Sequence, residues 1–251
     1  MALPPSLEGR VVVVTGGAGG IGSAIAHRFA EAGTRVVVTG RDEARARAAA
    51  GDLPGGGHIG LAAPVDDTAA LGRLADEITR RYGGLDVLVN CAGITRQVAH
   101  DDLEGLSDAL IDEIFRVNWR GAFACVRALR PLLAAGDGGL VVNISSISAI
   151  SGFGSNVAYC ASKAALDAMT RSLARALAPE IRVVSVSPGF VEGEYARRLD
   201  PAMLQAQRDR TPLGRLPTAD EVADAVLAAA THLRFSTGCI IPVDGGRPLY
   251  E

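Results

Sequence analysis

The sequence predicts an α/β fold, a doubly wound parallel sheet with helices on both faces and a single domain. Short runs of β-branched apolar residues recur along the chain, and the segments between them are alanine-rich and compatible with helices. With 251 residues, 48% of them apolar, the chain can bury one large core and needs no second domain. Its 30 glycines and low aromatic content of 4% favour close packing of helices on a sheet over an aromatic-rich β sandwich.

Five apolar runs are expected to form buried strands, because continuous β-branched residues are typical of strands covered on both faces. They occupy residues 11–14, 36–38, 87–89, 140–144 and 183–186. A glycine-rich loop at 54–57 is expected to lead into one further strand, the third in chain order. Helices are expected at residues 21–32, 41–50, 68–82, 108–133, 159–177 and 218–231. Gly33, Gly83 and Pro179 follow helix ends, where glycine takes a left-handed cap position or proline stops the helix.

The alternation of strands and helices implies right-handed crossovers, and in such a sheet the ligand crevice lies beyond the carboxyl ends of the strands. Residues 190–215 interrupt the alternation, because this segment is polar and contains an Asp-Pro and a Thr-Pro step. We expect it to be a mobile lid over the substrate, within one dinucleotide-binding and catalytic domain of residues 1–251. A passive surface excursion is the alternative interpretation.

Composition and charge exclude several classes of partner. The net charge is −3 and the arginines are scattered without a basic run, so no nucleic acid partner is expected. No stretch approaches the ~20 apolar residues of a membrane span and no targeting segment is visible, so we expect a cytoplasmic protein without a membrane partner. The four cysteines and four histidines are widely separated, so we expect reduced thiols and no metal site.

A glycine loop follows the first expected strand and opens directly into a helix. It reads Thr-Gly-Gly-Ala-Gly-Gly-Ile-Gly over residues 15–22. Glycines let the backbone turn sharply and approach a pyrophosphate, whose charge then meets free N–H groups at the helix N-terminus. The loop therefore predicts a dinucleotide site built on Gly16, Gly20, Ile21 and Gly22.

The end of the second strand indicates which dinucleotide is bound. An NAD site usually places a carboxylate there to hold the ribose 2′-hydroxyl, but this chain has Gly40 followed by Arg41. Because a guanidinium suits a 2′-phosphate, Arg41 favours NADP(H) over NAD(H). Alternatively, Arg41 is a solvated residue of the first helical turn, and Asp42 is the helix N-cap.

Tyr159 and Lys163 form a candidate acid/base pair, because a separation of four residues on a helix places their side chains next to each other. A nearby positive charge lowers the pKa of a phenol. A shift of ~3 units corresponds to roughly 4 kcal/mol, more than one partly solvated lysine supplies, so a second positive charge is expected nearby. Taken alone, the spacing also fits a half-buried aromatic residue beside a solvated lysine.

Seven motifs in order make the chain resemble the short-chain dehydrogenase/reductase family, in its compact single-domain, Rossmann-like branch, from about residue 10 to 246. Besides the glycine loop and the Tyr159/Lys163 pair, they are Asn90-x-Ala-Gly93, Asn118, Ser146, Pro188-Gly189 and Val-Asp-Gly-Gly at 243–246. The resemblance implies that Tyr159 is the general acid/base and that Ser146, thirteen residues before it, binds the substrate carbonyl oxygen.

The resemblance also implies roles for the remaining motif residues. Lys163 would hold the nicotinamide ribose and lower the pKa of Tyr159, with the oxidised nicotinamide ring as the second positive charge. Asn118 would anchor a water chain that relays the proton. The implied cofactor contacts are Gly16, Gly20, Ile21, Gly22, Arg41, Asn90, Gly93, Tyr159, Lys163, Pro188 and Gly189.

Three positions depart from the family pattern. Cys91 stands where a second asparagine is common. Pro64 stands where many members place an aspartate near the adenine, and that contact is not transferred to Asp66. Gly193 stands where a threonine commonly contacts the nicotinamide end of the cofactor, which puts the grip on the cofactor and the ordering of the lid in doubt.

The implied activity is hydride transfer between a nicotinamide cofactor and a ketone or secondary alcohol. The apolar stretch around Ile147, Phe153 and Val157 favours a nonpolar or mixed small-molecule substrate. Ile94-Thr-Arg96 resembles the 3-oxoacyl carrier-protein reductases, whereas residues 134–137 lack the basic character that would dock an acidic carrier protein. A dehydratase or epimerase, usually a longer chain, and a non-catalytic dinucleotide-binding regulator are the alternatives. A homotetramer is implied by resemblance only.

Overall fold

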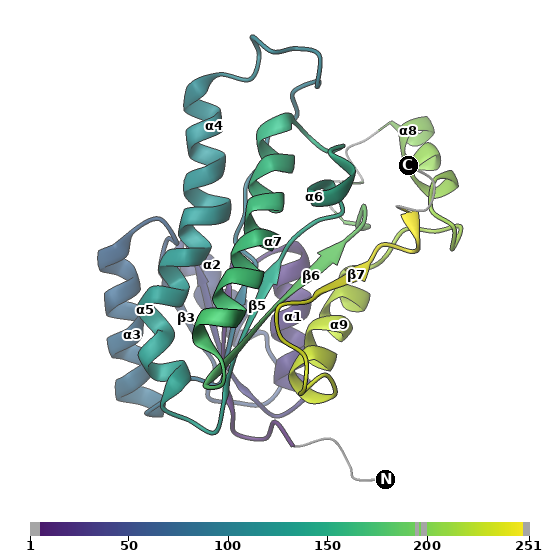
Figure 1. The fold of residues 1–251 in the computed structure, drawn as a ribbon. Helices are drawn as coiled ribbons and strands as arrows, with labels where there is room; N and C mark the ends of the chain where they lie inside the picture. Colours follow the sequence, from purple (N-terminus) through teal and green to yellow (C-terminus); the bar gives the residue numbers. More distant parts are fainter. Residues whose placement is uncertain (1–5, 194–195, 197–199, 248–251) are drawn as a thin grey trace.

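The β-branched runs form the strands of one parallel sheet (Figure 1). The computed structural model describes residues 6–193, 196 and 200–247. The strand order is β3-β2-β1-β4-β5-β6-β7, and each neighbouring pair is parallel. The strands are β1 (Val11–Thr15), β2 (Arg35–Gly40), β3 (Ile59–Ala62), β4 (Val87–Asn90), β5 (Gly139–Ile144), β6 (Ile181–Pro188) and β7 (Ile240–Val243). The predicted doubly wound parallel fold is confirmed.

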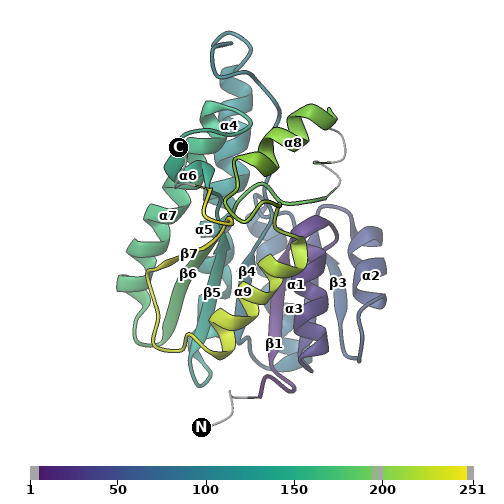
Figure 2. The same cartoon turned by 90° about the vertical axis from the view of Figure 1, so that its right-hand side faces the viewer.

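Helices cover both faces of this sheet (Figure 2). One face carries α1 (Gly20–Glu31), α2 (Glu43–Gly51) and α9 (Ala219–Thr231), and the other carries α3 (Thr68–Tyr82), α5 (Ala122–Ala134) and α7 (Val157–Leu177). A further helix, α4 (Asp108–Phe115), packs on α7 through a separate small core. The valines of β1 alternate between the two cores, since Val12 and Val14 face the first layer and Val11 and Val13 the second. Burial on both faces explains why this strand is apolar throughout. None of the described helices combines the length and apolar character needed to cross a bilayer.

The long helix expected at residues 108–133 is interrupted by a π-helical turn. This turn, η1 (Arg116–Gly121), lies between α4 and α5 and contains Asn118. A π-helical turn shifts the following residues around the helix and is common at functional sites. Hydrophobic periodicity does not predict this π-helical turn. The turn adds only one residue, and the apolar patterns of α4 and of α5 each remain those of an ordinary helix.

The segment expected to be a lid contains a helix that the sequence analysis missed. The helix is α8 (Pro201–Asp209), and Asp200 caps it by accepting a hydrogen bond from the N–H of Ala202 at 2.8 Å. The Asp-Pro step is therefore a helix start, with proline at a position where its missing N–H costs nothing. Asp42 caps α2 as expected, by accepting from the N–H of Arg45 at 3.0 Å.

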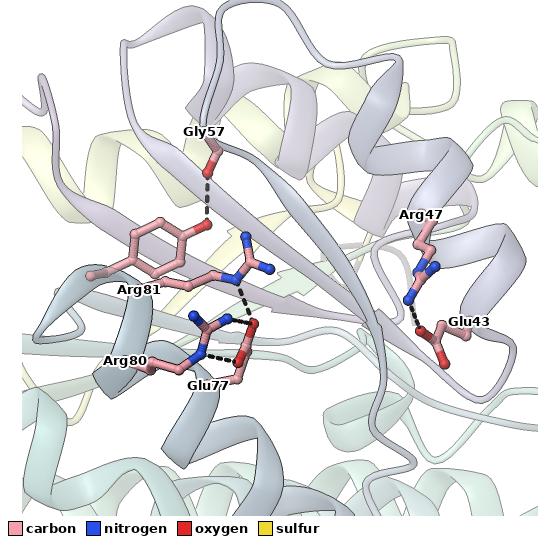
Figure 3. Close-up of polar contacts among 7 residues, drawn as sticks. Glu43, Arg47, Gly57, Glu77, Arg80 and Arg81 are labelled. Carbon is pink, nitrogen blue, oxygen red and sulfur yellow. Dashed lines mark hydrogen bonds and ion pairs between the residues drawn. The ribbon is translucent and has the colours of Figure 1, made fainter.

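Arginines on α2 and α3, the helices that flank β3, are paired with carboxylates of their own helices (Figure 3). Arg80 and Arg81 both donate to Glu77, and Arg47 pairs with Glu43. The hydrogen bonds from Arg80 and then Arg81 lower the pKa of Glu77 to about 2. These pairs offset the positive charge of this surface, in keeping with an arginine distribution that forms no basic run.

Candidate active site

The carboxyl ends of the central strands bring the predicted site residues to one edge of the sheet. Thr15 of β1 is level with Asn90 of β4, which is level with Asn143 of β5. The glycine loop follows β1, Gly93 follows β4 by three residues, and Ser146 follows β5 by two. The parallel arrangement therefore gathers motifs that lie more than 100 residues apart in the chain.

The glycine loop presents an open helix N-terminus. The N-cap of α1 is Gly19, which makes no side-chain cap, and the first turn carries no acidic residue. Gly20 has a φ of +48°, and no atom lies within 4 Å of the position that its Cβ would occupy. A Cβ on Gly22 would lie 2.3 Å from the Gly16 oxygen, so only glycine lets α1 pack this closely on the loop. Uncapped N–H groups at the start of a twelve-residue helix fit a pyrophosphate.

A cavity of about 360 Å³ extends from this loop over the ends of β2 and β3. Arg41 lines it and has no hydrogen-bond or ion-pair partner among the described residues. Pro64 also lines it, and Asp66 is engaged by Arg116, which donates to it at 2.7 Å. The other lining residues are Gly16, Gly40, Ala63, Val65, Ala92, Gly93, Ile94, Glu113 and Val117. Apolar walls with one unpaired guanidinium fit the adenosine half of a phosphorylated dinucleotide.

Two buried polar residues hold the turn after β4. Thr15 Oγ1 accepts hydrogen bonds from the N–H groups of Cys91 and Ala92 at 3.0 and 3.1 Å. Asn90 is 4% exposed and donates to Asn143 Oδ1 at 2.9 Å. Asn90 also donates to the Ala122 carbonyl at 3.4 Å, so it ties the end of β4 to β5 and α5, while Thr15 holds the turn that leads to Gly93. The sequence analysis gave Thr15 no separate role, although a threonine at a strand end directly before the glycine loop is a signal of such a brace.

Lys163 and Tyr159 lie next to each other on α7, as their spacing predicts. Lys163 Nζ is 5.7 Å from the centroid of the Tyr159 ring and donates to the Ile144 carbonyl at 2.7 Å. Lys163 is only 6% exposed, so the interpretation as a solvated lysine is wrong. It is also the only lysine among the 25 lysine and arginine residues of the chain. The single lysine therefore occupies the position that the pair requires.

Burial lowers the pKa of Lys163 from its ordinary 10.5 to about 8. Cys91 and Asp167 act in the opposite direction and raise it. At neutral pH the ammonium form still predominates, because the pKa lies about one unit above the pH. An arginine could not take this place with a pKa near 8, since its guanidinium stays charged throughout the accessible pH range.

Asn118 is buried in η1 and joins the turn after β4 to α7. Its Oδ1 accepts from the Ile94 N–H at 2.8 Å, and its Nδ2 donates to the Ile94 carbonyl at 3.0 Å and to Ser162 Oγ at 3.1 Å. A Cβ on Gly93 would lie 3.4 Å from Asn118 Oδ1 and 3.7 Å from Lys163 Nζ. The structure therefore brings Gly93, Asn118 and Lys163 together, and it adds Ser162, which the sequence analysis missed.

Ser146 follows β5 and is partly exposed, whereas Ser145 is 4% exposed. Ser146 Oγ donates to Ser148 Oγ and accepts from the Ser148 N–H, both at 3.2 Å. Ser148 belongs to α6 (Ser148–Ser151), a single turn that follows the strand. Of the two neighbouring serines, Ser146 is thus the more accessible to solvent, and its role as the substrate-binding serine stays a prediction.

Asn156 fixes the start of α7 and the loop after β4, and the sequence analysis missed it. Its side chain accepts from the Tyr159 N–H at 2.7 Å and donates to the Arg96 carbonyl, also at 2.7 Å. Asparagine directly before an apolar helical segment is a recognisable N-cap, so a signal was present. The contact to Arg96 joins segments 60 residues apart and could not be predicted from local pattern.

The last predicted cofactor residues, Pro188 and Gly189, end β6 beside β7. Gly189 N–H donates to the Val243 carbonyl at 2.9 Å, and a Cβ on Gly189 would lie 3.0 Å from Asp244 Cα. The two late motifs are thus packed against each other. Part of the expected lid, including Glu194, lies outside the described residues.

The helices α6 and α8 lie at the same end of the molecule (Figures 1 and 2). Large apolar side chains on these helices and next to them are exposed. Phe153 is 53% exposed, although its ring stacks on His100 with centroids 5.7 Å apart. The others there are Ile150, Val157, Met203 and Leu213. Among the described residues, no group of three or more histidine, cysteine, aspartate or glutamate side chains could hold a metal ion.

Comparisons with known proteins agree with this geometry. A family model described as Enoyl-(Acyl carrier protein) reductase matches residues 16–247. The 3-oxoacyl-[acyl-carrier-protein] reductase FabG of Aquifex aeolicus (strain VF5) is 36% identical over 96% of this chain and 98% of that protein. The (2S)-[(R)-hydroxy(phenyl)methyl]succinyl-CoA dehydrogenase subunit BbsD of Thauera aromatica is 34% identical over 97% of this chain and 98% of that protein. A solved short-chain dehydrogenase/reductase from Brucella melitensis, titled glucose/ribitol dehydrogenase, matches with a TM-score of 0.90 at 32% identity, over 96% of this chain and 98% of that one.

Proposed function

Because the chain belongs to the short-chain dehydrogenase/reductase family, we propose that this enzyme transfers a hydride between NADP(H) and a ketone or secondary alcohol, with Tyr159 as general acid/base. The observation that carries the proposal is the placement of the only lysine, buried beside Tyr159 and next to Asn118 and Gly93. A non-catalytic dinucleotide-binding regulator would have no use for a buried lysine with a lowered pKa, because its burial costs stability.

In the reductive direction, Ser146 Oγ donates a hydrogen bond to the carbonyl oxygen of the substrate and Tyr159 donates its proton to the developing alkoxide. When bound, the cofactor would supply the hydride and, in its oxidised form, a second positive charge that favours the phenolate. The Lys163 ammonium favours the phenolate that Tyr159 becomes, because an opposite charge nearby stabilises the ionised form.

Asn118 is proposed to anchor the waters that return a proton to Tyr159. Both hydrogens of its amide group are already donated, one to the Ile94 carbonyl and one to Ser162. The waters of the relay are therefore expected to donate hydrogen bonds to an oxygen atom of Asn118. The π-helical turn supports this role, since single π-helical turns are frequent at functional sites.

Replacing Arg41 with alanine is expected to weaken the use of NADPH about 10- to 100-fold, because a charge-assisted hydrogen bond to phosphate is worth roughly 1.5–3 kcal/mol. Use of NADH, which has no 2′-phosphate, is expected to change little. Steady-state kcat/KM for both cofactors measures the effect. Arg47→Ala is the matched control, since Arg47 lies on α2, the helix that follows Arg41, but is paired with Glu43. Equal losses with both cofactors would refute the assignment of Arg41.

The proposed substrate is a small molecule with an apolar body, because Phe153, Ile150 and Val157 are exposed close to Ser146 along the chain. A second candidate is a 3-oxoacyl thioester carried on an acyl carrier protein. The Ile94-Thr-Arg96 stretch and the similarity to a 3-oxoacyl-[acyl-carrier-protein] reductase favour it. Residues 134–137, which offer no basic side chain, argue against docking of an acidic carrier. A cytoplasmic homotetramer, as implied by the resemblance, is likewise a proposal.

One experiment tests the function and separates these candidates. The purified protein is assayed with NADPH and NADH against aliphatic ketones, aryl ketones, a 3-oxoacyl-CoA and the same acyl group on a carrier protein. We expect NADPH-dependent reduction of apolar ketones or the CoA thioester without a gain from the carrier protein. A large gain from the carrier would establish the second candidate. Absence of cofactor oxidation with the whole panel would contradict the proposed activity.

A further inference from the structure

Asp167 is a buried carboxylate that the proposed mechanism does not use. It lies on α7 one turn after Lys163 and is 4% exposed. Its Oδ1 is fully buried and has no hydrogen-bond partner among the described residues. Placing a carboxylate oxygen in the interior without a partner costs free energy, and burial accordingly raises the pKa of Asp167. The charged form of Asp167 therefore depends on the polar and charged groups around it.

The groups that face Asp167 come from β5, β6 and α7. Burial raises its pKa, while the Ser145 and Ser185 hydroxyls and the charges of Arg171 and Lys163 lower it. Ser145 Oγ is itself buried without a fully formed hydrogen bond to a described residue. Ser145 directly precedes Ser146, so Asp167 is the residue of α7 that faces the end of β5, one helical turn after Lys163.

Burial lowers the pKa of Lys163, and two neighbouring groups, Cys91 and Asp167, raise it. Burial raises the pKa of the Cys91 thiol to about 11, so this thiol is still neutral where Lys163 titrates, near pH 8. The Tyr159 ring is the other titratable group facing Lys163, and in the protonated state it carries no charge. Asp167 is thus the group that can supply a negative charge to Lys163 at neutral pH.

We propose that Asp167 is a positioning residue that keeps Lys163 protonated and links it to the Ser145–Ser146 strand end. The carboxylate acts through Lys163 and touches neither substrate nor cofactor. The consequence for catalysis rests on the proposed function, because it requires that Lys163 serves Tyr159. The electrostatic link between Asp167 and Lys163 does not depend on that function.

The single lysine makes a direct test possible. Protein labelled with ¹³C and ¹⁵N in lysine alone has one lysine side-chain signal, and its shift from pH 6 to 11 reports the protonation of Lys163 without cofactor or substrate. In Asp167→Asn we expect the titration midpoint to fall by about one pH unit, a roughly tenfold lower proton affinity. In Asp167→Glu, which keeps the charge, the titration midpoint should lie close to that of the wild-type protein. An unchanged midpoint in Asp167→Asn would overturn the proposal.

Thr170→Val is the matched control, because Thr170 is fully buried on the same helix and bonds Ser185 at 2.8 Å but carries no charge. It is expected to lower stability without moving the Lys163 midpoint, and a shift equal to that of Asp167→Asn would show that loosening of α7 is the cause. Cys91→Ser gives a test that does not require the aspartate variant to fold. We expect no fall in the midpoint, and a fall of about one unit would assign the negative charge to Cys91 and refute the role of Asp167.

The catalytic consequence is a separate measurement on the complete enzyme. The alkaline limb of the pH profile of kcat is expected to move to lower pH by the same amount in Asp167→Asn, with KM for the cofactor little changed. A shifted lysine titration without a shifted pH profile would show that the link exists but that Lys163 does not control the reaction. That outcome would contradict the proposed mechanism rather than the position of Asp167.

Discussion

Phenylalanine in place of Tyr159 is expected to lower kcat for carbonyl reduction by about 10³-fold or more. A positioned acid or base contributes about 10²- to 10⁴-fold, and phenylalanine has no hydroxyl proton to donate. Loss of the phenolic hydroxyl removes no packing volume of note, because the ring is retained. Binding of NADPH is expected to persist, since the glycine loop and the cavity around Arg41 are untouched.

The measurement pairs single-turnover kinetics with NADPH binding followed by fluorescence. Tyr82→Phe serves as the matched control, because Tyr82 Oη donates to the Gly57 carbonyl at 2.7 Å at the far end of α3, beside the residues of Figure 3. The control should retain full activity. If Tyr159→Phe keeps substantial turnover while binding the cofactor normally, the acid/base role of Tyr159 is wrong.

Ser146→Ala is expected to lower kcat by about 10²- to 10³-fold, the usual cost of losing one hydrogen-bond donor to a developing oxyanion. The alanine fits the site, since Ser146 is partly exposed and its hydroxyl contacts only Ser148 among the described residues. Because the donor acts mainly on the transition state, KM for the ketone should change much less than kcat.

Ser145→Ala provides the comparison for this prediction. Ser145 has the same side chain and is adjacent in sequence, but it is buried and faces Asp167 instead of the crevice. We expect its replacement to reduce kcat only a few-fold, through the position of Lys163. Similar losses in the two variants would show that the strand end acts as a unit and that Ser146 has no separate contact with the carbonyl oxygen.

Much of the fold follows from local sequence pattern. The valine runs of β1 and β2 are buried on both faces, which only a strand covered by helices on each side provides. Asp42 was identifiable as a cap because its carboxylate needs only the next turn of backbone. The Asp200-Pro201 step is an equally local signal for a helix start, although the polar segment around it has no apolar periodicity that would indicate a helix.

The parts of the site that the sequence did not reveal depend on partners that are distant in the chain. Asn156 has a recognisable cap pattern, but its bond to Arg96 exists only because the loop after β4 passes the start of α7. Ser162 gains its role from Asn118, which reaches it through the π-helical turn. Sequence periodicity does not predict such contacts, because the hydrogen-bond partners of a buried polar group can lie anywhere in the chain.

The sequence by itself determined the chemistry of this protein: a glycine loop that admits a phosphate, a guanidinium at the end of β2, and a tyrosine four residues before the only lysine. These are properties of residue type and short spacing. The tertiary structure decided how that lysine behaves. Packing of α7 against the end of β5 and the turn after β4 buries Lys163 and lowers its pKa to about 8. The same packing buries Asp167, one helical turn further along α7. A pKa is determined by the solvent and charges around a group, and these are fixed only when distant segments pack together.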